Sequence, residues 1–339
     1  MSFGKGKNDY GFGKKKKRNL FLKFVVAPLA LLSLIVISTG IYSFIHANRI
    51  MRREPKPLED FARNILPAFS AVSFNSLDGN TVLGGWFFPG GEPGAHTVVM
   101  VHENGKNRLQ YGAGTIGIYE FFTENGFNVL SFDLRNSGNS GGKLSSFGYG
   151  EWEDVLGAVL YVKETIASPG VLLYGFKSGV TACLIAAEKL ESRENGQEGI
   201  SGLPFDSRYI KGFILDAPLA SSSDYIRHYS IEEVFAGKIF GQHTIPFAIR
   251  LSAINEREHS LAAILARTQS PVHIISEEYA DPFLFERSDL VVKERLRLFP
   301  NHTTVYKSSG HANGDPFLHD AGLYLSSIED FLRVFFPKR

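Results

Sequence analysis

The chain has 339 residues, of which 44% are hydrophobic, and its 36 basic and 35 acidic residues give a formal net charge of +1. Such a chain can bury a large core, and its length allows one large domain or two small ones. The balanced charge argues against a nucleic-acid partner. The single cysteine, Cys183, excludes an intramolecular disulfide and is predicted to be a buried structural thiol, so the fold must be stabilised by its core.

The N-terminal part of the sequence is typical of a signal-anchored membrane protein. Residues 1–23 are rich in glycine, lysine and arginine, with Asp9 as the only acidic residue, and predict a disordered basic tail. Residues 24–45 contain no charged side chain and are long enough to cross a hydrocarbon core of about 30 Å as a helix. A cleavable signal peptide has a shorter apolar region, of about 7–15 residues. We therefore predict one transmembrane helix, with membrane lipid as its partner.

Basic residues lie on both sides of this predicted span, but they are more numerous before it. The positive-inside rule therefore favours a cytoplasmic N-terminus and an extracytoplasmic C-terminal portion. Residues 46–69 are rich in arginine, lysine and proline and predict a juxtamembrane linker. The sequence thus predicts a single-pass protein of the cell membrane.

The remainder, residues 70–339, has the pattern of one α/β domain. Residues 71–76 and 81–88 flank an Asp78-Gly79 turn and predict a hairpin. Residues 97–102 form a continuous apolar run, as in strands that are buried on both faces of a parallel sheet. Strand and helix patterns then alternate, which predicts a doubly wound, mostly parallel sheet. The further predicted strands are 127–132, 171–175, 209–215, 271–275 and 303–307, and the predicted helices are 115–124, 151–165, 179–189, 289–297 and 320–336.

The alternation is interrupted at about residues 219–270, where aromatic and basic residues accompany helical stretches. This segment lies between two predicted strands, so we predict a small helical cap over the carboxyl edge of the sheet. The aromatic residues favour an apolar or acyl-containing small molecule or peptide as a ligand. That hypothesis rests on composition and on the predicted membrane anchor.

Residues 171–182 combine an apolar strand, a glycine-flanked turn and a helix, which is the setting of the nucleophile elbow G-x-S-x-G. The residue at the central position is Lys177, with Gly175 and Gly179 two residues away on either side. These flanking positions must be small because the turn is tight. A frame with Ser178 at the centre would put Phe176 and Val180 there, which is sterically poor.

With these features the chain resembles the bacterial membrane-anchored α/β-hydrolases related to the serine aminopeptidase-like group, over about residues 70–336. The resemblance implies the α/β-hydrolase fold, and it rests on the order and spacing of several short stretches. These are His102-Glu103-Asn104-Gly105-Lys106-Asn107-Arg108, Asp133-Leu134-Arg135-Asn136-Ser137-Gly138-Asn139-Ser140-Gly141-Gly142, Phe147-Gly148-Tyr149-Gly150-Glu151-Trp152-Glu153-Asp154, the elbow, Leu215-Asp216-Ala217-Pro218, Asp281-Pro282-Phe283-Leu284 and Gly310-His311-Ala312-Asn313.

The resemblance implies acyl-transfer chemistry, in which a serine attacks a carbonyl, a histidine carries its proton and an acid orients the histidine. By this resemblance Lys177 stands at the serine position, Asp281 matches the acid and His311 matches the base. The oxyanion donors would be the backbone N–H groups of Asn104 and Ser178. The resemblance implies no cofactor.

Asp133 and Arg135 resemble a structural pair that stabilises the glycine-rich loop of the family. His102, His302, Asp315, His319 and Asp320 match no metal-ligand spacing, so no metal site is predicted.

The sequence departs from the family at the mouth of the expected site. Besides Lys177 at the elbow, Glu103 replaces a glycine after the third strand, and Ser276-Glu277 replaces a His-Gly pair after the next-to-last strand. A lysine ammonium has a pKa of about 10.4 and is not nucleophilic at neutral pH unless it is strongly desolvated.

Three functions remain open. The first is a pseudoenzyme that has lost serine-hydrolase activity and binds a ligand in its cleft, with Lys177 paired to Asp281 or to another carboxylate. The second is an active ester, amide or peptide hydrolase that uses Ser178 or activated water with His311 and Asp281. The third is an imine-forming enzyme that uses Lys177.

Overall fold

The computed structural model describes residues 21–59, 65–91, 94–194, 200, 202–253, 256–277, 281–308 and 315–337. Its strands form one eight-stranded sheet in the order β1-β2-β4-β3-β5-β6-β7-β8. Only β1 and β2 run antiparallel to their neighbours, and the other pairings are parallel. The strands are β1 Ser70–Asn75, β2 Val82–Phe88, β3 Thr97–Val101, β4 Asn128–Phe132, β5 Val171–Phe176, β6 Ile210–Asp216, β7 Val272–Glu277 and β8 Thr303–Ser308. The predicted hairpin and mostly parallel sheet are therefore confirmed.

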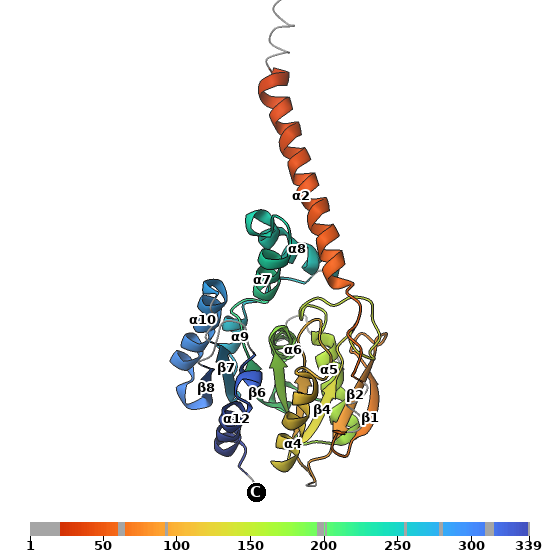
Figure 1. The fold of residues 1–339 in the computed structure, drawn as a ribbon, viewed down its shortest axis with the longest axis vertical. Helices are drawn as coiled ribbons and strands as arrows, with labels where there is room; N and C mark the ends of the chain where they lie inside the picture. Colours follow the sequence, from red (N-terminus) through yellow and green to blue (C-terminus); the bar gives the residue numbers. More distant parts are fainter. Residues whose placement is uncertain are drawn as a thin grey trace, which may run out of the picture.

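Helices cover both faces of the sheet, as the unbroken apolar runs of its central strands require. Successive residues of β3 point to opposite faces: Val99 and Val101 belong to one core cluster, and Val98 and Met100 belong to the other. The first cluster includes residues of α5 Trp152–Tyr161, α6 Ser178–Glu194, α9 Leu261–Leu265 and α10 Pro282–Leu298, and the second includes residues of α4 Thr115–Glu124 and α12 Ala321–Phe335. Figure 1 shows these helices around the sheet.

Helix α10 begins earlier than the sequence pattern predicted, at Pro282 instead of about residue 289. The reason is a strong N-terminal signal: the Asp281 side chain accepts a 2.9 Å hydrogen bond from the backbone N–H of Leu284, and Pro282 occupies the first helical position. The short segments η2 Gly112–Gly114, η3 Val162–Ile166, η4 Ser207–Tyr209, η6 Pro300–His302 and α11 Pro316–His319 complete the domain.

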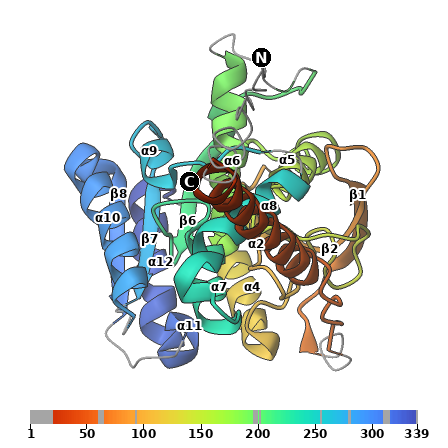
Figure 2. The ribbon, with the colours of Figure 1, turned by 90° about the horizontal axis from the view of Figure 1, so that it is seen from above.

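A long N-terminal helix joins the domain through the predicted cap. The turn η1 Leu22–Val26 continues into α2 Ala27–Met51, and this stretch is the one described helix that is long and apolar enough to cross a membrane. It continues past the predicted span into the predicted linker, because one side of its last turns, formed by Ser43, Ala47, Ile50 and Met51, is buried against the domain. Figures 1 and 2 show α8 lying beside this end of α2.

The predicted cap contains α7 Asp224–Glu233, η5 Gly237–Gly241 and α8 Gln242–Ala253, followed by α9. The hydroxyl of Ser43 in α2 donates a 2.6 Å hydrogen bond to the hydroxyl of Thr244 in α8. The buried Ala47 of α2 belongs to the same core cluster as Ile245 and Ala248 of α8. Contacts between cap and α2 are therefore both polar and apolar.

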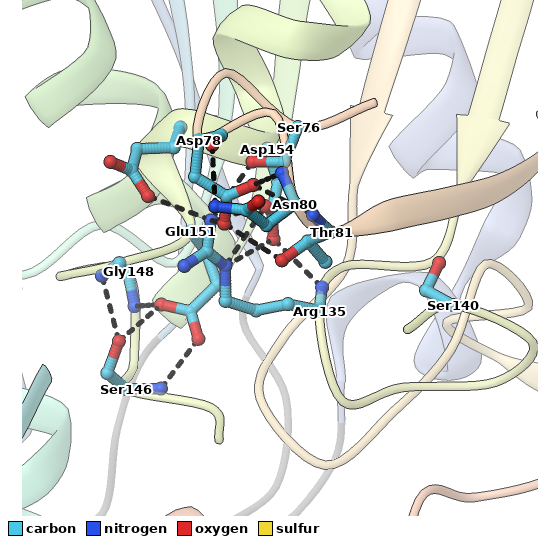
Figure 3. A network of polar contacts seen from close by, with 12 residues as sticks. Ser76, Asp78, Asn80, Thr81, Arg135, Ser140, Ser146, Gly148, Glu151 and Asp154 are labelled. Carbon is cyan, nitrogen blue, oxygen red and sulfur yellow. Dashed lines mark hydrogen bonds and ion pairs between the residues drawn. The ribbon is translucent and has the colours of Figure 1, made fainter. Parts of the chain in front are cut away.

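Two separate ionic groups hold the glycine-rich loop after β4. Asp133 accepts a 2.6 Å hydrogen bond from the buried guanidinium of Arg108, whereas Arg135 pairs with Asp154 at 2.8 Å and with Glu153 at 3.0 Å. Figure 3 shows the Arg135 network. Burial raises the pKa of Asp154 to about 6, although the charge and hydrogen bonds of Arg135 oppose that rise. Asp133 and Arg135 thus stabilise this loop through different partners instead of acting as one pair.

Candidate functional site

Lys177 lies at the apex of the turn between β5 and α6, at the carboxyl edge of the sheet. Its φ of 47° is in the left-handed region, which a residue other than glycine adopts only when its surroundings impose it. A side chain at Gly179 would place its Cβ 2.2 Å from the carbonyl oxygen of Val101, and one at Gly175 would place it 2.7 Å from the backbone nitrogen of Val180. Strand β3 and helix α6 thus press against the turn and fix Lys177 at its apex.

The Lys177 ammonium is neutralised by carboxylates from neighbouring segments. It forms an ion pair with Asp315, just before α11, and a second one with Glu103, which follows β3, at 3.6 Å. Burial alone would lower the pKa of Lys177, but Glu103, Asp315 and Glu277 together raise it above its ordinary value. The ammonium is therefore protonated at neutral pH.

The neighbours of Glu103 shift the pKa of its carboxyl group and fix its backbone. Burial raises the pKa of its carboxyl group, and Asp315 adds to the rise, whereas Lys177 and Lys106 lower it. Its backbone N–H donates a 2.9 Å hydrogen bond to the side chain of Gln110, which fixes the loop after β3. Glu103 thus supplies one of the two negative charges that hold Lys177.

Ser178 is the first residue of α6, and its side chain is turned into the protein. Its Oγ accepts a 2.8 Å hydrogen bond from the backbone N–H of Asn104, and the residue is 4% exposed. The cavity beside these two residues has a volume of about 10 Å³, enough for about one water molecule. In this structure the Asn104 N–H, a predicted oxyanion donor, is therefore engaged by the Ser178 hydroxyl.

Asp281 and His311 are the two remaining predicted site residues, and the structure describes only the first. Asp281 is described, and its carboxylate caps α10; Lys177 pairs with Glu103 and Asp315 instead of with Asp281. His311 lies in residues 309–314, outside the described residues. The assignments of Asp281 as the acid and of His311 as the base stay predictions from the resemblance.

A buried carboxylate below Lys177 was not singled out from the sequence. Asp216 ends β6, and its backbone oxygen accepts a 2.8 Å hydrogen bond from the Lys177 N–H. Its Oδ2 accepts hydrogen bonds of 2.6 Å from the hydroxyls of Tyr111 and Tyr324. Burial raises the pKa of Asp216 to about 6, although both tyrosines and Lys177 oppose the rise.

The position of Asp216 at the end of a buried strand was the available signal, because carboxyl ends of parallel strands meet at one edge. The sequence pattern predicts no contact between Asp315 and Lys177, because this ion pair depends on tertiary packing. The described part of the site therefore combines one protonated amine with several carboxylates.

No family model matches the chain. A curated relative, the uncharacterized protein YqkD of Bacillus subtilis, is 22% identical over 251 residues, which cover 70% of this chain and 71% of YqkD. Among solved structures, the Pyrococcus furiosus esterase Pf2001 has a TM-score of 0.61 and 19% identity, and the match covers 84% of this chain and 98% of the esterase.

Two further solved structures are similar in the same way. An α/β-hydrolase from Vibrio vulnificus has a TM-score of 0.57 and 17% identity over 85% of this chain and 92% of its own. Est1E of Butyrivibrio proteoclasticus, solved with ferulic acid, has a TM-score of 0.57 and 16% identity over 79% of this chain and all of its own, 100%. Together with the sheet order, these likenesses establish the α/β-hydrolase fold.

Proposed function

We propose that this chain is a membrane-anchored protein of α/β-hydrolase fold in which Lys177 takes the place of the nucleophilic serine, so that ordinary serine-hydrolase activity is lost and the edge of the sheet serves for binding. The observation that carries the proposal is the position of the Lys177 ammonium, at the apex of the turn and between the carboxylates of Glu103 and Asp315.

The electrostatics of Lys177 support this proposal over a lysine-based enzyme. An imine-forming lysine needs a free amine, and therefore a pKa lowered by desolvation or by a neighbouring cation. Here the carboxylates raise the pKa of Lys177 above its ordinary value. The amine is thus stabilised in the protonated form, which cannot attack a carbonyl.

The surroundings of Ser178 also argue against its use as a displaced nucleophile. Its hydroxyl oxygen accepts a hydrogen bond from Asn104, which lowers its electron density, and the residue is 4% exposed. In subtilisin, loss of the triad serine reduces turnover by a factor of about 10⁶. We therefore expect hydrolysis by this chain to be close to background.

The anchoring part of the proposal rests on residues 22–51, whose apolar side chains are largely exposed along the first part of the helix. The excess of basic residues before the span favours a cytoplasmic N-terminus and an extracytoplasmic domain. We propose an apolar or acyl-containing small molecule or peptide as the ligand, because the cap is rich in aromatic residues and lies next to the anchor.

A serine-directed fluorophosphonate probe tests the loss of activity. The full chain in lipid nanodiscs is treated with the probe, and labelled positions are mapped by mass spectrometry. We expect no labelling of the wild-type chain, and labelling at position 177 in Lys177→Ser, with Lys177→Ala as the matched control. Wild-type labelling at Ser178 that disappears in Ser178→Ala would overturn the proposal.

The proposed ligand class is tested separately, by thermal shift of the same nanodisc sample with acyl lipids and apolar peptides. No thermal shift with any of them would exclude this ligand class.

A further inference from the structure

The cap carries an exposed apolar stripe. Phe235, Ile239, Phe247 and Leu251 are 88%, 77%, 55% and 45% exposed. Phe235 lies in the turn just before η5, Ile239 lies in η5, and Phe247 and Leu251 lie in α8, with the exposed His243 near the start of that helix. Phe247 and Leu251 are four residues apart and lie on one face of α8. All four apolar side chains are exposed on the surface of the cap.

The stripe begins where the cap contacts α2. The hydroxyl of Tyr42 donates a hydrogen bond to the carbonyl oxygen of Phe235, and its ring lies edge-on to Phe240, at a centroid distance of 5.1 Å. One residue further along, Ser43 bonds to Thr244 of α8. The exposed stripe is therefore continuous in space with the predicted membrane span, and Figure 1 shows the cap lying along the lower part of α2.

The length of the predicted span indicates the depth in the bilayer at which the cap contacts α2. Residues 24–45 form a helix of about 33 Å at a rise of about 1.5 Å per residue, close to the hydrocarbon thickness of about 30 Å. Tyr42 and Ser43 thus lie in the last turn of the apolar run, at the level where hydrocarbon gives way to headgroups. Arg49, Arg52 and Arg53 follow at headgroup level.

We propose that the stripe formed by Phe235, Ile239, Phe247 and Leu251 is a membrane-contacting surface that inserts into the same leaflet from which α2 emerges. This inference rests on the proposed membrane anchor. Large exposed apolar side chains in one patch mark a contact surface, and an amphipathic helix at a bilayer surface buries phenylalanine and leucine while lysine faces the headgroups. The exposed Lys238 lies within this segment. The occupant is lipid, because the patch continues the lipid-facing surface of α2.

A consequence concerns the candidate site. The cap follows β6, whose last residue Asp216 accepts a backbone hydrogen bond from Lys177. The Tyr225 hydroxyl in α7 of the cap donates a hydrogen bond to the carbonyl of Ala217, the residue directly after β6. With the stripe in the leaflet, the carboxyl edge of the sheet is held near the membrane. Ligands that are dissolved in the bilayer would therefore reach this edge from the lipid phase.

Site-specific fluorescence in lipid tests the proposal on the full chain. Single cysteines are introduced as Phe235→Cys and Phe247→Cys, labelled with an environment-sensitive fluorophore and reconstituted in vesicles of phosphatidylcholine and phosphatidylglycerol. Leu34→Cys, on the exposed surface of α2, reports on the anchor, and Val334→Cys, on the exposed surface of α12, reports on a face far from it. The native Cys183 is buried, and the chain without an added cysteine gives the background.

We expect doxyl-labelled lipid to quench the probes at positions 34, 235 and 247, and to leave the probe at 334 unchanged. A shallow doxyl group should quench positions 235 and 247 more than a deep one does, whereas position 34 should respond to the deep one. If position 34 is not quenched, the anchor itself is refuted. If position 34 is quenched and positions 235 and 247 behave like 334, only the cap contact is refuted. Protection of 235 and 247 from aqueous iodide without lipid quenching would indicate a protein partner and also overturn the proposal.

Discussion

The backbone N–H of Asn104 donates a 2.8 Å hydrogen bond to Ser178 Oγ, and this contact joins the loop after β3 to the first turn of α6. In a serine hydrolase the N–H at this place would be aimed at a developing oxyanion. Here the Ser178 hydroxyl, directly beside Lys177, accepts the hydrogen bond from this N–H. The contact therefore gives Ser178 a structural role that can be separated from catalysis by mutation.

Ser178→Ala should lower stability without changing hydrolysis. The substitution leaves the N–H of Asn104 without its acceptor, which costs about 1–3 kcal/mol for a buried group. Chemical denaturation of the reconstituted chain measures this loss, and Ser252→Ala, at an exposed position of α8, serves as the control. A loss of hydrolytic activity in Ser178→Ala, at unchanged stability, would contradict the structural role.

Lys177→Met should destabilise the domain, because it leaves the carboxylates of Glu103 and Asp315 facing each other. For a partly buried pair we expect about 1–2 kcal/mol, between the values for exposed and buried ion pairs. The matched control is Lys293→Met, which removes an exposed ion pair with Asp289 and should cost less.

The pH dependence of Lys177 has a definite sign. Its pKa is raised on folding, so the stabilisation it contributes is complete below its ordinary pKa of 10.5 and is lost as the pH rises above that value. Thermal unfolding of wild type and Lys177→Met should therefore differ at pH 7–9 and converge at higher pH. Equal stability of the two proteins at pH 7 would refute the ion-pair interpretation.

Asp216→Asn should remove a pH-dependent loss of stability. Burial raises the pKa of Asp216 from 3.8 to about 6 on folding. A raised pKa means that stability is complete below pH 3.8 and falls as the pH rises through about 6, by about 2–3 kcal/mol. The stability difference between wild type and Asp216→Asn should change in this window and be flat above it.

Arg135→Met should be among the most destabilising single substitutions in the chain. It leaves the fully buried Asp154 without its cation, and loss of one partner of a buried pair costs about 3–5 kcal/mol. Arg333→Met removes the exposed pair with Asp330 and should cost at most about 1 kcal/mol. Because the pKa of Asp154 rises further without Arg135, the destabilisation should be larger at pH 8 than at pH 5. A small effect that does not depend on pH would contradict the role of Arg135.

Local sequence was enough for the sheet and for the apex of the elbow. The apolar run of residues 97–102 predicted a strand buried on both faces, because such a strand needs apolar side chains at successive positions. The spacing of Gly175 and Gly179 predicted which residue lies at the apex, because only that frame avoids a clash with the backbone of neighbouring elements. Both patterns span only a few residues, so the strand and the apex residue can be predicted without knowledge of the fold.

The partners of Lys177 were decided only by the tertiary structure. Glu103 follows β3 and Asp315 precedes α11, far from Lys177 in sequence, and charges of this kind have no spacing rule between segments. The same holds for the cap. Its composition marked residues 219–270 as helical and aromatic, but its contact with α2 through Ser43 and Thr244 depends on how the chain returns over the sheet. The sequence by itself therefore determined the strands, the candidate membrane span and Lys177 at the apex. The packing of distant segments determined how far α2 continues, what neutralises the charge of Lys177 and which residues of the cap stay exposed.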